Sequence, residues 1–310
     1  MSTIKDVAKY TGLSVGTISR YLNGEQLKVR NQLAIEQAIK ELGYERNSIA
    51  RSMKIGKTMT IAVIVPYLAN MFSMRVIESI ERELQKSNYC VIVSDCGGDL
   101  KKEISRIEFM KSRQVDGFVL MPSGNKARDI KKAAGHIPLV LVDRILEDEI
   151  FDSVIIDNEE ITYRHVVSLL KNGVRKIGII QGPSNISTAR QRQLGYERAL
   201  KEYNIPKEYF YDCKEYSIME GLNGMTYLEQ FQLEAIFASN YELSVGAVNA
   251  ISNEQMHILG FDTFDIPIRY YKNYVGIPQP IEKIGTLSAK LLLQRIQEPD
   301  KDIVNHVIHM

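Results

Sequence analysis

A run of small and polar residues near the N-terminus has the chemistry needed to read base edges in DNA. Val15, Gly16, Thr17, Ser19 and Arg20 fall within one short segment with helical spacing. Small side chains let a helix backbone come close to the bases, and an arginine can donate two hydrogen bonds to guanine. The segment therefore predicts a helix in the major groove of double-stranded DNA. The alternative is a small helical bundle that binds no partner.

Signals for catalysis and metal binding are weak by comparison. No Walker-type phosphate loop occurs, and the cysteines Cys90, Cys96 and Cys213 form no Cys-x-x-Cys pair. His306 and His309 lie close in sequence, but no further metal ligand accompanies them. No paired nucleophile and base emerges either. We therefore expect a protein that is not an enzyme and that has no metal or cofactor.

Three short helices are expected to position the DNA-reading segment. Thr3 starts the first helix with a capping-box-like pattern, and Gly12 permits the left-handed turn that ends it. Ser14 caps a second helix over 15–21, and a third helix runs over about 31–42. Two short helices joined by a glycine-containing turn are typical of the helix-turn-helix motif.

The charge of the chain is divided unevenly along its length. The 310 residues carry a formal net charge of +1, but residues 1–60 hold ten lysines and arginines against five acidic residues. The first sixty residues are thus at +5 and the remainder at −4. A basic head on a mildly acidic body suits a polyanion partner. No apolar run is long enough to span a membrane, and the start lacks a secretory signal, so we expect a cytoplasmic protein.

From residue 60 onward, short apolar runs alternate with helical patterns such as 74–86 and 195–203. This alternation predicts parallel sheets covered by helices on both faces. Two such series in one chain predict two lobes with a ligand cleft at the carboxyl ends of the strands. The expected strands are 61–65, 90–94, 117–121, 139–142, 154–156, 176–180, 235–238 and 257–261.

The head resembles that of the lactose-repressor (LacI/GalR) family of bacterial transcription regulators. The resemblance rests on residues 3–8 (TIKDVA), 12–24 (GLSVGTISRYLNG) and 42–44 (LGY), and residues 47–53 (NSIARSM) are similar to the family's hinge helix. In the family a leucine of this helix wedges into the minor groove, and Met53 takes that position here. The DNA-binding residues that the resemblance implies are Thr3, Ser14, Val15, Gly16, Thr17, Ser19, Arg20, Asn23, Asn31, Asn47, Ala50 and Met53.

The resemblance extends through the body, in motifs such as 116–122 (DGFVLMP), 192–196 (RQLGY) and 260–262 (GFD). It implies a periplasmic-binding-protein-like fold and an arginine that clamps ligand hydroxyls or carboxylates. Tyr241 and Thr263 stand where members often have acidic residues, which predicts a less acidic cleft. For several of these positions core packing or loop capping is an equal alternative. The effector residues that the resemblance implies are Phe72, Asp143, Arg192, Tyr216, Asn240, Asp262 and Gln279.

The expected architecture has three parts. An all-α helix-turn-helix head spans 1–46, and a hinge helix with its linker spans 47–59. An α/β two-lobed effector and dimerisation domain spans 60–310, with an N-lobe of about 60–157 plus a C-terminal crossover and a C-lobe of about 158–278.

The expected function is that of a DNA-binding transcription regulator, a repressor, controlled by a small-molecule effector. The partners would be a pseudo-palindromic operator, a sugar or sugar phosphate, and a second copy of the chain, with a tetramer as an alternative. A second hypothesis is a catabolite-control regulator that responds to a phosphocarrier protein, although Ile281, Glu282 and Lys283 replace the tyrosine and aspartate typical of such members. A third hypothesis is a solute-binding protein with a vestigial head.

Overall fold

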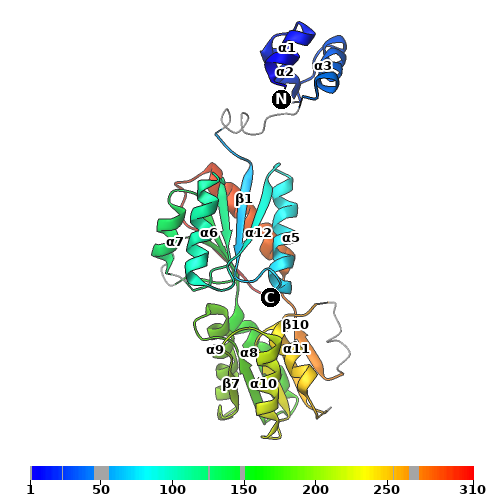
Figure 1. The fold of residues 1–310 in the computed structure, drawn as a ribbon. Helices are drawn as coiled ribbons and strands as arrows, with labels where there is room; N and C mark the ends of the chain where they lie inside the picture. The colour runs from blue at the N-terminus through cyan, green and yellow to red at the C-terminus, as the bar shows by residue number, and fades with distance from the viewer. Residues whose placement is uncertain are drawn as a thin grey trace. The chain divides into compact units, whose positions relative to one another are not determined.

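The computed structural model describes residues 2–22, 24–44, 56–124, 126–146, 151–253, 255–264 and 272–310 (Figure 1). It divides into one unit spanning Met1–Thr58 and a second spanning Met59–Met310, called the head and the body below. Four predicted DNA-binding residues, Asn23, Asn47, Ala50 and Met53, lie outside the described residues.

The head is a three-helix bundle made of α1 (Ile4–Thr11), α2 (Val15–Leu22) and α3 (Val29–Leu42). Its small core gathers one face of each helix, through the buried residues Val7, Ala8, Ile18, Ile35 and Ala38. The third helix begins two residues earlier than predicted, at Val29. The residue before it, Lys28, provides no capping hydrogen bond from its side chain, because an ammonium group has no acceptor.

The turn between α1 and α2 forms as the sequence predicted. Asp6 accepts hydrogen bonds of 2.8 Å from both the backbone N–H and the hydroxyl of Thr3, which fixes the start of α1. Gly12 ends α1 with φ of 68°, a left-handed conformation that residues with a Cβ atom resist.

The body contains two sheets, and every strand pair in them is parallel. The six-stranded sheet has the order β11-β5-β4-β3-β1-β2, and the five-stranded sheet has the order β10-β9-β8-β6-β7. Strands of the first sheet are β1 (Thr60–Val65), β2 (Cys90–Asp95), β3 (Gly117–Leu120), β4 (Leu139–Val142), β5 (Asp152–Ile156) and β11 (Asn305–Ile308). Strands of the second are β6 (Ile177–Gln181), β7 (Phe210–Asp212), β8 (Ala235–Ala238), β9 (His257–Phe261) and β10 (Tyr274–Ile277).

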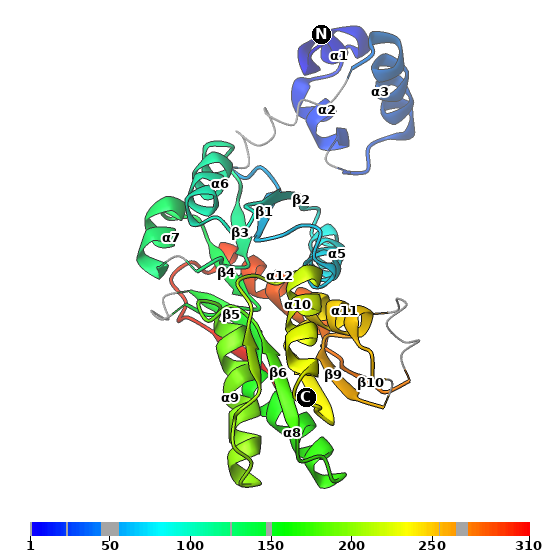
Figure 2. The same cartoon turned by 60° about the horizontal axis from the view of Figure 1, so that its bottom comes forward.

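Helices cover both faces of each sheet, because successive side chains of a buried strand point to opposite faces and both sets are apolar here. Along β1, Val63 packs toward α5 (Met71–Gln85) and α12 (Ile281–Gln297), whereas Ile64 packs toward α6 (Leu100–Ser112) and α7 (Ala127–Ala134). The second sheet lies between one helix pair, α8 (Asn158–Lys171) and α9 (Ser187–Glu202), and another, α10 (Ile218–Glu229) and α11 (Tyr241–Ala250) (Figure 2).

We call the first sheet with α5, α6, α7 and α12 the N-lobe, and the second sheet with α8 to α11 the C-lobe. The chain crosses between the lobes after β5 and again after β10, so the N-lobe contains the C-terminal elements α12 and β11. The predicted fold class is therefore confirmed: a helical head precedes a two-lobed α/β body with parallel sheets.

Three strands were not predicted: β7, β10 and β11. Each is three or four residues long and lies at the edge of its sheet. Among the described residues, no helix is long and apolar enough to cross a membrane.

Candidate functional site

All seven predicted effector residues line a single cavity of about 230 Å³ in the body. We call it the cleft cavity, because its walls come from both lobes. Phe72, in the first turn of α5, and Asp143, directly after β4, belong to the N-lobe. The other five come from the C-lobe or from its connection to α12: Arg192, Tyr216, Asn240, Asp262 and Gln279.

Arg192 is held rigidly in the wall of this cavity. Its side chain is buried on α9, where Nε donates to Asn158 Oδ1 at 2.8 Å and Nη1 donates to the backbone oxygen of Ser239 at 2.7 Å. The guanidinium carbon lies 3.6 Å from the ring centroid of Phe261, so the planar group stacks on an aromatic face. Because these contacts fix the fork in advance, little side-chain entropy remains to be lost when a ligand is bound.

A close contact between two helices determines where Arg192 lies. Gly195, one turn further along α9, faces α8, and a Cβ atom built there would lie 2.2 Å from the backbone oxygen of Glu159. Only glycine allows this approach, and the approach brings Asn158, at the start of α8, within reach of Arg192.

Two carboxylates follow strands that end at the cleft cavity. Asp143 comes after β4 and Asp262 after β9, and both have positive φ angles, of 69° and 73°. Aspartate tolerates this conformation better than most residues, and it turns the chain sharply at the end of a strand. Burial raises the pKa of both carboxyl groups, while the positive charge of Arg192 opposes the shift. Both carboxylates are suited to accept hydrogen bonds from ligand hydroxyls.

An acidic residue that the sequence analysis did not name, Glu242, also lines the cavity. The side chain of Tyr241 is buried in the core instead, with its ring centroid 4.8 Å from that of Phe264. Glu242 accepts hydrogen bonds from the side chains of Asn70, at 2.7 Å, and Asn240, and burial raises the pKa of its carboxyl group. The acidic group is thus supplied from a position one residue further along the chain than the family pattern suggested.

The remaining predicted residues complete the wall. Asn240 caps α11 by accepting a 2.9 Å hydrogen bond from the backbone N–H of Leu243, so it has a structural role as well as a place in the cavity. Gln279 donates a hydrogen bond to Asp262. Phe72 is 6% exposed, and Tyr216 packs over Gly182, where a Cβ atom would lie 2.4 Å from the ring. The two rings give the cavity apolar surface beside its polar groups.

Sequence reasoning missed nine further residues of this wall, among them the polar residues Asn70, Arg144 and Glu242. A signal existed for two of these three. Asn70 follows the predicted strand 61–65 and precedes a helix, and Arg144 directly follows a predicted site residue. No sequence signal pointed to Glu242, because the sequence alone does not show whether Tyr241 or Glu242 faces the cleft.

In the head, α2 carries the five predicted DNA-reading residues around its one buried residue, Ile18, with Gly16 and Arg20 on the side away from it. Val15 is 41% exposed, and Gly16 and Arg20 are exposed, while Thr17 and Ser19 are half-buried. Thr3 and Ser14 are exposed near the N-termini of α1 and α2, and Asn31 is half-buried on α3. The exposed residues at the start and on the outer side of α2 are therefore Val15, Gly16 and Arg20.

Residues 12–16 (GLSVG) also satisfy the Gly-x-Ser-x-Gly pattern of a hydrolase nucleophile, which sequence reasoning overlooked. The structure gives Ser14 a different role. Its Oγ accepts a 3.1 Å hydrogen bond from the backbone N–H of Thr17 and lies 2.9 Å from the hydroxyl of Thr17, as a helix N-cap does. A nucleophile elbow requires a strand before the serine, and here α1 precedes it.

A helix-turn-helix head joined to a two-lobed body with a polar cavity is the architecture of a ligand-responsive DNA-binding regulator. Residues 3–47 match the family described as bacterial regulatory proteins of the lacI family, and residues 58–279 match the periplasmic binding proteins and sugar binding domain of the LacI family. The chain therefore belongs to the LacI family of bacterial regulatory proteins, and the resemblance predicted from its motifs is confirmed. It is a DNA-binding transcription regulator.

Similar proteins agree with this assignment over nearly the full chain. The sequence is 30% identical to "Probable HTH-type transcriptional regulator EndR" of Paenibacillus polymyxa, over 97% of this chain and 93% of that protein. It is 29% identical to the ribose operon repressor of Haemophilus influenzae, over 97% of this chain and 94% of that protein. A Lac repressor dimer bound to operator and the anti-inducer ONPF has the same fold, with a TM-score of 0.88 at 22% identity, covering 99% of this chain and 96% of that one.

Proposed function

We propose that this protein is a homodimeric repressor whose binding to a pseudo-palindromic operator is controlled by a small polar effector in the cleft cavity. The observation that carries the proposal is the convergence of the effector residues predicted from separate motifs on one cavity between the lobes. A ligand that contacts both lobes favours the conformation in which they lie closest, and so it shifts the population of DNA-competent dimers. The protein would act in the bacterial cytoplasm and join the nucleoid when bound to its operator.

The proposed DNA-binding roles centre on α2. Val15, Gly16, Thr17, Ser19 and Arg20 read a half-site in the major groove, with Arg20 as the guanine-reading residue. Asn47, Ala50 and Met53 engage the centre of the operator, with Met53 as the apolar wedge. The exposed hydroxyls of Thr3 and Ser14 and the amides of Asn23 and Asn31 complete the surface toward the phosphates.

A sugar or sugar phosphate is the effector class that suits the cleft cavity. Its polar wall pairs the donor fork of Arg192 with the acceptors Asp143, Glu242 and Asp262, the combination that vicinal hydroxyl groups require. Phe72 and Tyr216 offer flat apolar surface for the C–H face of a sugar ring. The similarity to the ribose operon repressor of Haemophilus influenzae supports this class, since that protein is named for the operon of a sugar.

A DNA selection experiment tests the DNA-binding half of the proposal. The full-length protein is incubated with random duplexes, and bound sequences are recovered; we expect a pseudo-palindrome. Arg20→Ala should then lose its preference for that site over random DNA, by about 1–3 kcal/mol for each guanine that Arg20 reads. Lys40→Ala is the matched control, because it removes the same charge from an exposed position on α3. Unchanged selectivity in Arg20→Ala would contradict the proposal.

A further inference from the structure

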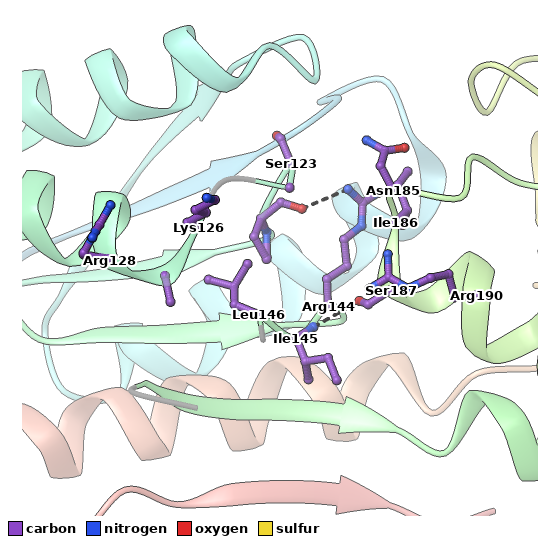
Figure 3. A pocket seen from close by; sticks show the side chains of 13 residues that line it. Ser123, Lys126, Arg128, Arg144, Ile145, Leu146, Asn185, Ile186, Ser187 and Arg190 are labelled. Atoms are coloured by element: carbon purple, nitrogen blue, oxygen red, sulfur yellow. Dashed lines mark hydrogen bonds between the residues drawn. The ribbon is translucent and has the colours of Figure 1, made fainter. Parts of the chain in front are cut away.

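The body has a second cavity, larger than the cleft cavity, with a volume of about 500 Å³ (Figure 3). Its walls come from residues 122–124, 126–128 and 144–146 in the N-lobe, and from residues 185–187 and Arg190 in the C-lobe. Arg144 lines both cavities, so the two are neighbours. None of the seven predicted effector residues lines the larger one.

Positive charge dominates this second cavity, which we call the basic cavity. Lys126, directly before α7, and Arg128, in the first turn of α7, line it from the N-lobe, Arg190 lines it from α9, and Arg144 lies between Lys126 and Arg190 (Figure 3). No carboxylate is among the described residues that line it. Lys126, Arg128 and Arg190 are exposed, and Arg144, beside Asp143, is largely buried. Like charges that line one cavity from both lobes repel one another, and an anion between them relieves that repulsion.

Two helices also begin at this cavity without a capping side chain. The residues before α7 and α9 are Lys126 and Ile186, and neither accepts a hydrogen bond from the first turn of its helix through its side chain. The positive ends of both helix dipoles, with N–H groups in the first turn, therefore add to the field of the cations. Five other helices of the body have a side-chain cap: α5, α6, α8, α10 and α11, through Asn70, Asp99, Asp157, Ser217 and Asn240. Like α7 and α9, α12 lacks one, but it begins after Pro280, away from this cavity.

Among the four cations of the basic cavity, Arg144 has the most constrained side chain. Its side chain is 12% exposed, and Nη1 donates a 3.0 Å hydrogen bond to the backbone oxygen of Pro122. Nearby, the N–H of Ile145 donates to Ser187 Oγ at 3.2 Å, which joins the two lobes at the floor of the basic cavity. The guanidinium group is thus held in place between Asp143, on the cleft side, and the other three cations.

We propose that the basic cavity binds a phosphate group or a similarly charged oxyanion. The group is either carried by the effector, which then extends from the cleft cavity past Arg144, or bound as a free ion beside an uncharged effector. An anion carried by the effector rests on the proposed function, and in that case the effector is a phosphorylated rather than a neutral sugar. Because both lobes supply cations, the anion would stabilise the closed arrangement of the lobes in either case.

The test measures binding of inorganic phosphate to the full-length protein, at constant ionic strength maintained with chloride, by titration calorimetry and by the melting temperature. Lys126→Gln, Arg128→Gln and Arg190→Gln are combined in one variant. Its matched control combines Lys102→Gln, Lys171→Gln and Lys201→Gln, which remove the same charge from exposed positions outside the cavity. We expect phosphate to stabilise the wild type and the control by mass action. We expect its affinity for the cavity variant to be lower by about tenfold or more.

A second arm compares ribose with ribose 5-phosphate as probes of the two sources. If the effector carries the anion, the phosphorylated probe binds more tightly than ribose, and the cavity variant loses that difference. If the anion binds as a free ion, phosphate binds without either sugar and the cavity variant loses it. Arg192→Ala should impair sugar binding while leaving inorganic phosphate binding intact, so failure of the proposed function is distinguishable from failure of this inference.

Three results would overturn the inference. The first is that phosphate stabilises the wild type no more than chloride does. The second is that the cavity variant binds phosphate as the wild type does. The third concerns the chain's own acidic run, Glu147, Asp148 and Glu149, which follows the cavity residue Leu146 in sequence and lies outside the described residues. If Glu147→Gln, Asp148→Asn and Glu149→Gln together create phosphate binding that the wild type lacks, the run is the natural occupant.

Discussion

The side-chain amide of Asn70 donates a 2.7 Å hydrogen bond to the carboxylate of Glu242 and so joins the two lobes at the cleft cavity. Asn70 is also the N-cap of α5, where its oxygen accepts from the backbone N–H of Ser73 at 2.9 Å. Glu242 is in the first turn of α11. One hydrogen bond therefore couples the first turns of two helices from different lobes to the wall of the ligand cavity.

Replacing Asn70 by aspartate should open the lobes without removing the cap of α5. The aspartate oxygen still accepts from Ser73, but the donor to Glu242 is replaced by a second carboxylate, which repels it. We expect the radius of gyration measured by small-angle X-ray scattering to rise and effector affinity to fall about tenfold or more, the scale of removing a charge-assisted hydrogen bond. Asn172→Asp, on an exposed helix end, is the control for added charge. An unchanged scattering profile and affinity would show that this hydrogen bond does not hold the lobes together.

The raised pKa values of Asp143, Glu242 and Asp262 predict that effector binding weakens in mild acid. Burial is the main cause of each shift, so these carboxyl groups take up protons at a higher pH than exposed ones. A protonated carboxyl accepts ligand hydroxyls less well, and affinity should therefore fall as the pH is lowered through the raised pKa values of these groups. Calorimetry across this range measures the effect together with proton release on binding. A flat profile would exclude these carboxylates as the ligand acceptors.

The same raised pKa values have the opposite pH dependence for the contribution of these groups to the stability of the fold, which increases as the pH is lowered. Each folded-state pKa lies above its unfolded value, so the folded chain binds protons more readily, and the contribution of these groups to stability falls as the pH rises through the raised pKa values. Asp262→Asn removes one such buried charge. We expect its melting temperature at neutral pH to equal or exceed that of the wild type, while its effector binding is lost. A variant that is clearly less stable at neutral pH would contradict this sign.

Gly195→Ala should separate α9 from α8 and so displace the side chain of Arg192 from Asn158. The added Cβ atom would lie 2.2 Å from the backbone oxygen of Glu159, and a backbone atom cannot move aside as a flexible side chain can. Overpacking of this kind costs about 1–3 kcal/mol, and the altered helix packing weakens effector binding as well. Leu194→Ala, at the neighbouring exposed position, should change neither the melting temperature nor the affinity appreciably. Equal behaviour of the two variants would contradict the packing argument.

The buried strands of both lobes could be predicted from the sequence because each is encoded by a local run of apolar residues. Buried parallel strands such as β4 and β8 are uninterrupted apolar runs, and both were predicted with their observed bounds. The edge strand β11 is different. Only Ile308 of its four residues is buried, and it pairs with β5 from the far end of the chain. No local pattern encodes that partner.

The cleft cavity was predictable only where motifs carried its residues. The seven predicted side chains meet because the carboxyl ends of parallel strands lie at one edge of each sheet. Glu242 and Asn70 were missed because their roles depend on a hydrogen bond between lobes that are far apart in sequence. The basic cavity was missed for the same reason: Lys126 and Arg190 look like ordinary surface charges until the fold places them on opposite walls.

The central claim is that occupancy of the cleft cavity controls the affinity of the head for DNA. The most direct test measures operator affinity of the full-length protein with and without a saturating effector, in the wild type and in Arg192→Ala. The account predicts that effector changes the wild-type affinity by about 5- to 150-fold, the usual size of such a coupling, and leaves that of Arg192→Ala unchanged. An equal response of the two proteins, or no response in the wild type at an effector concentration that fills the cavity, would contradict it.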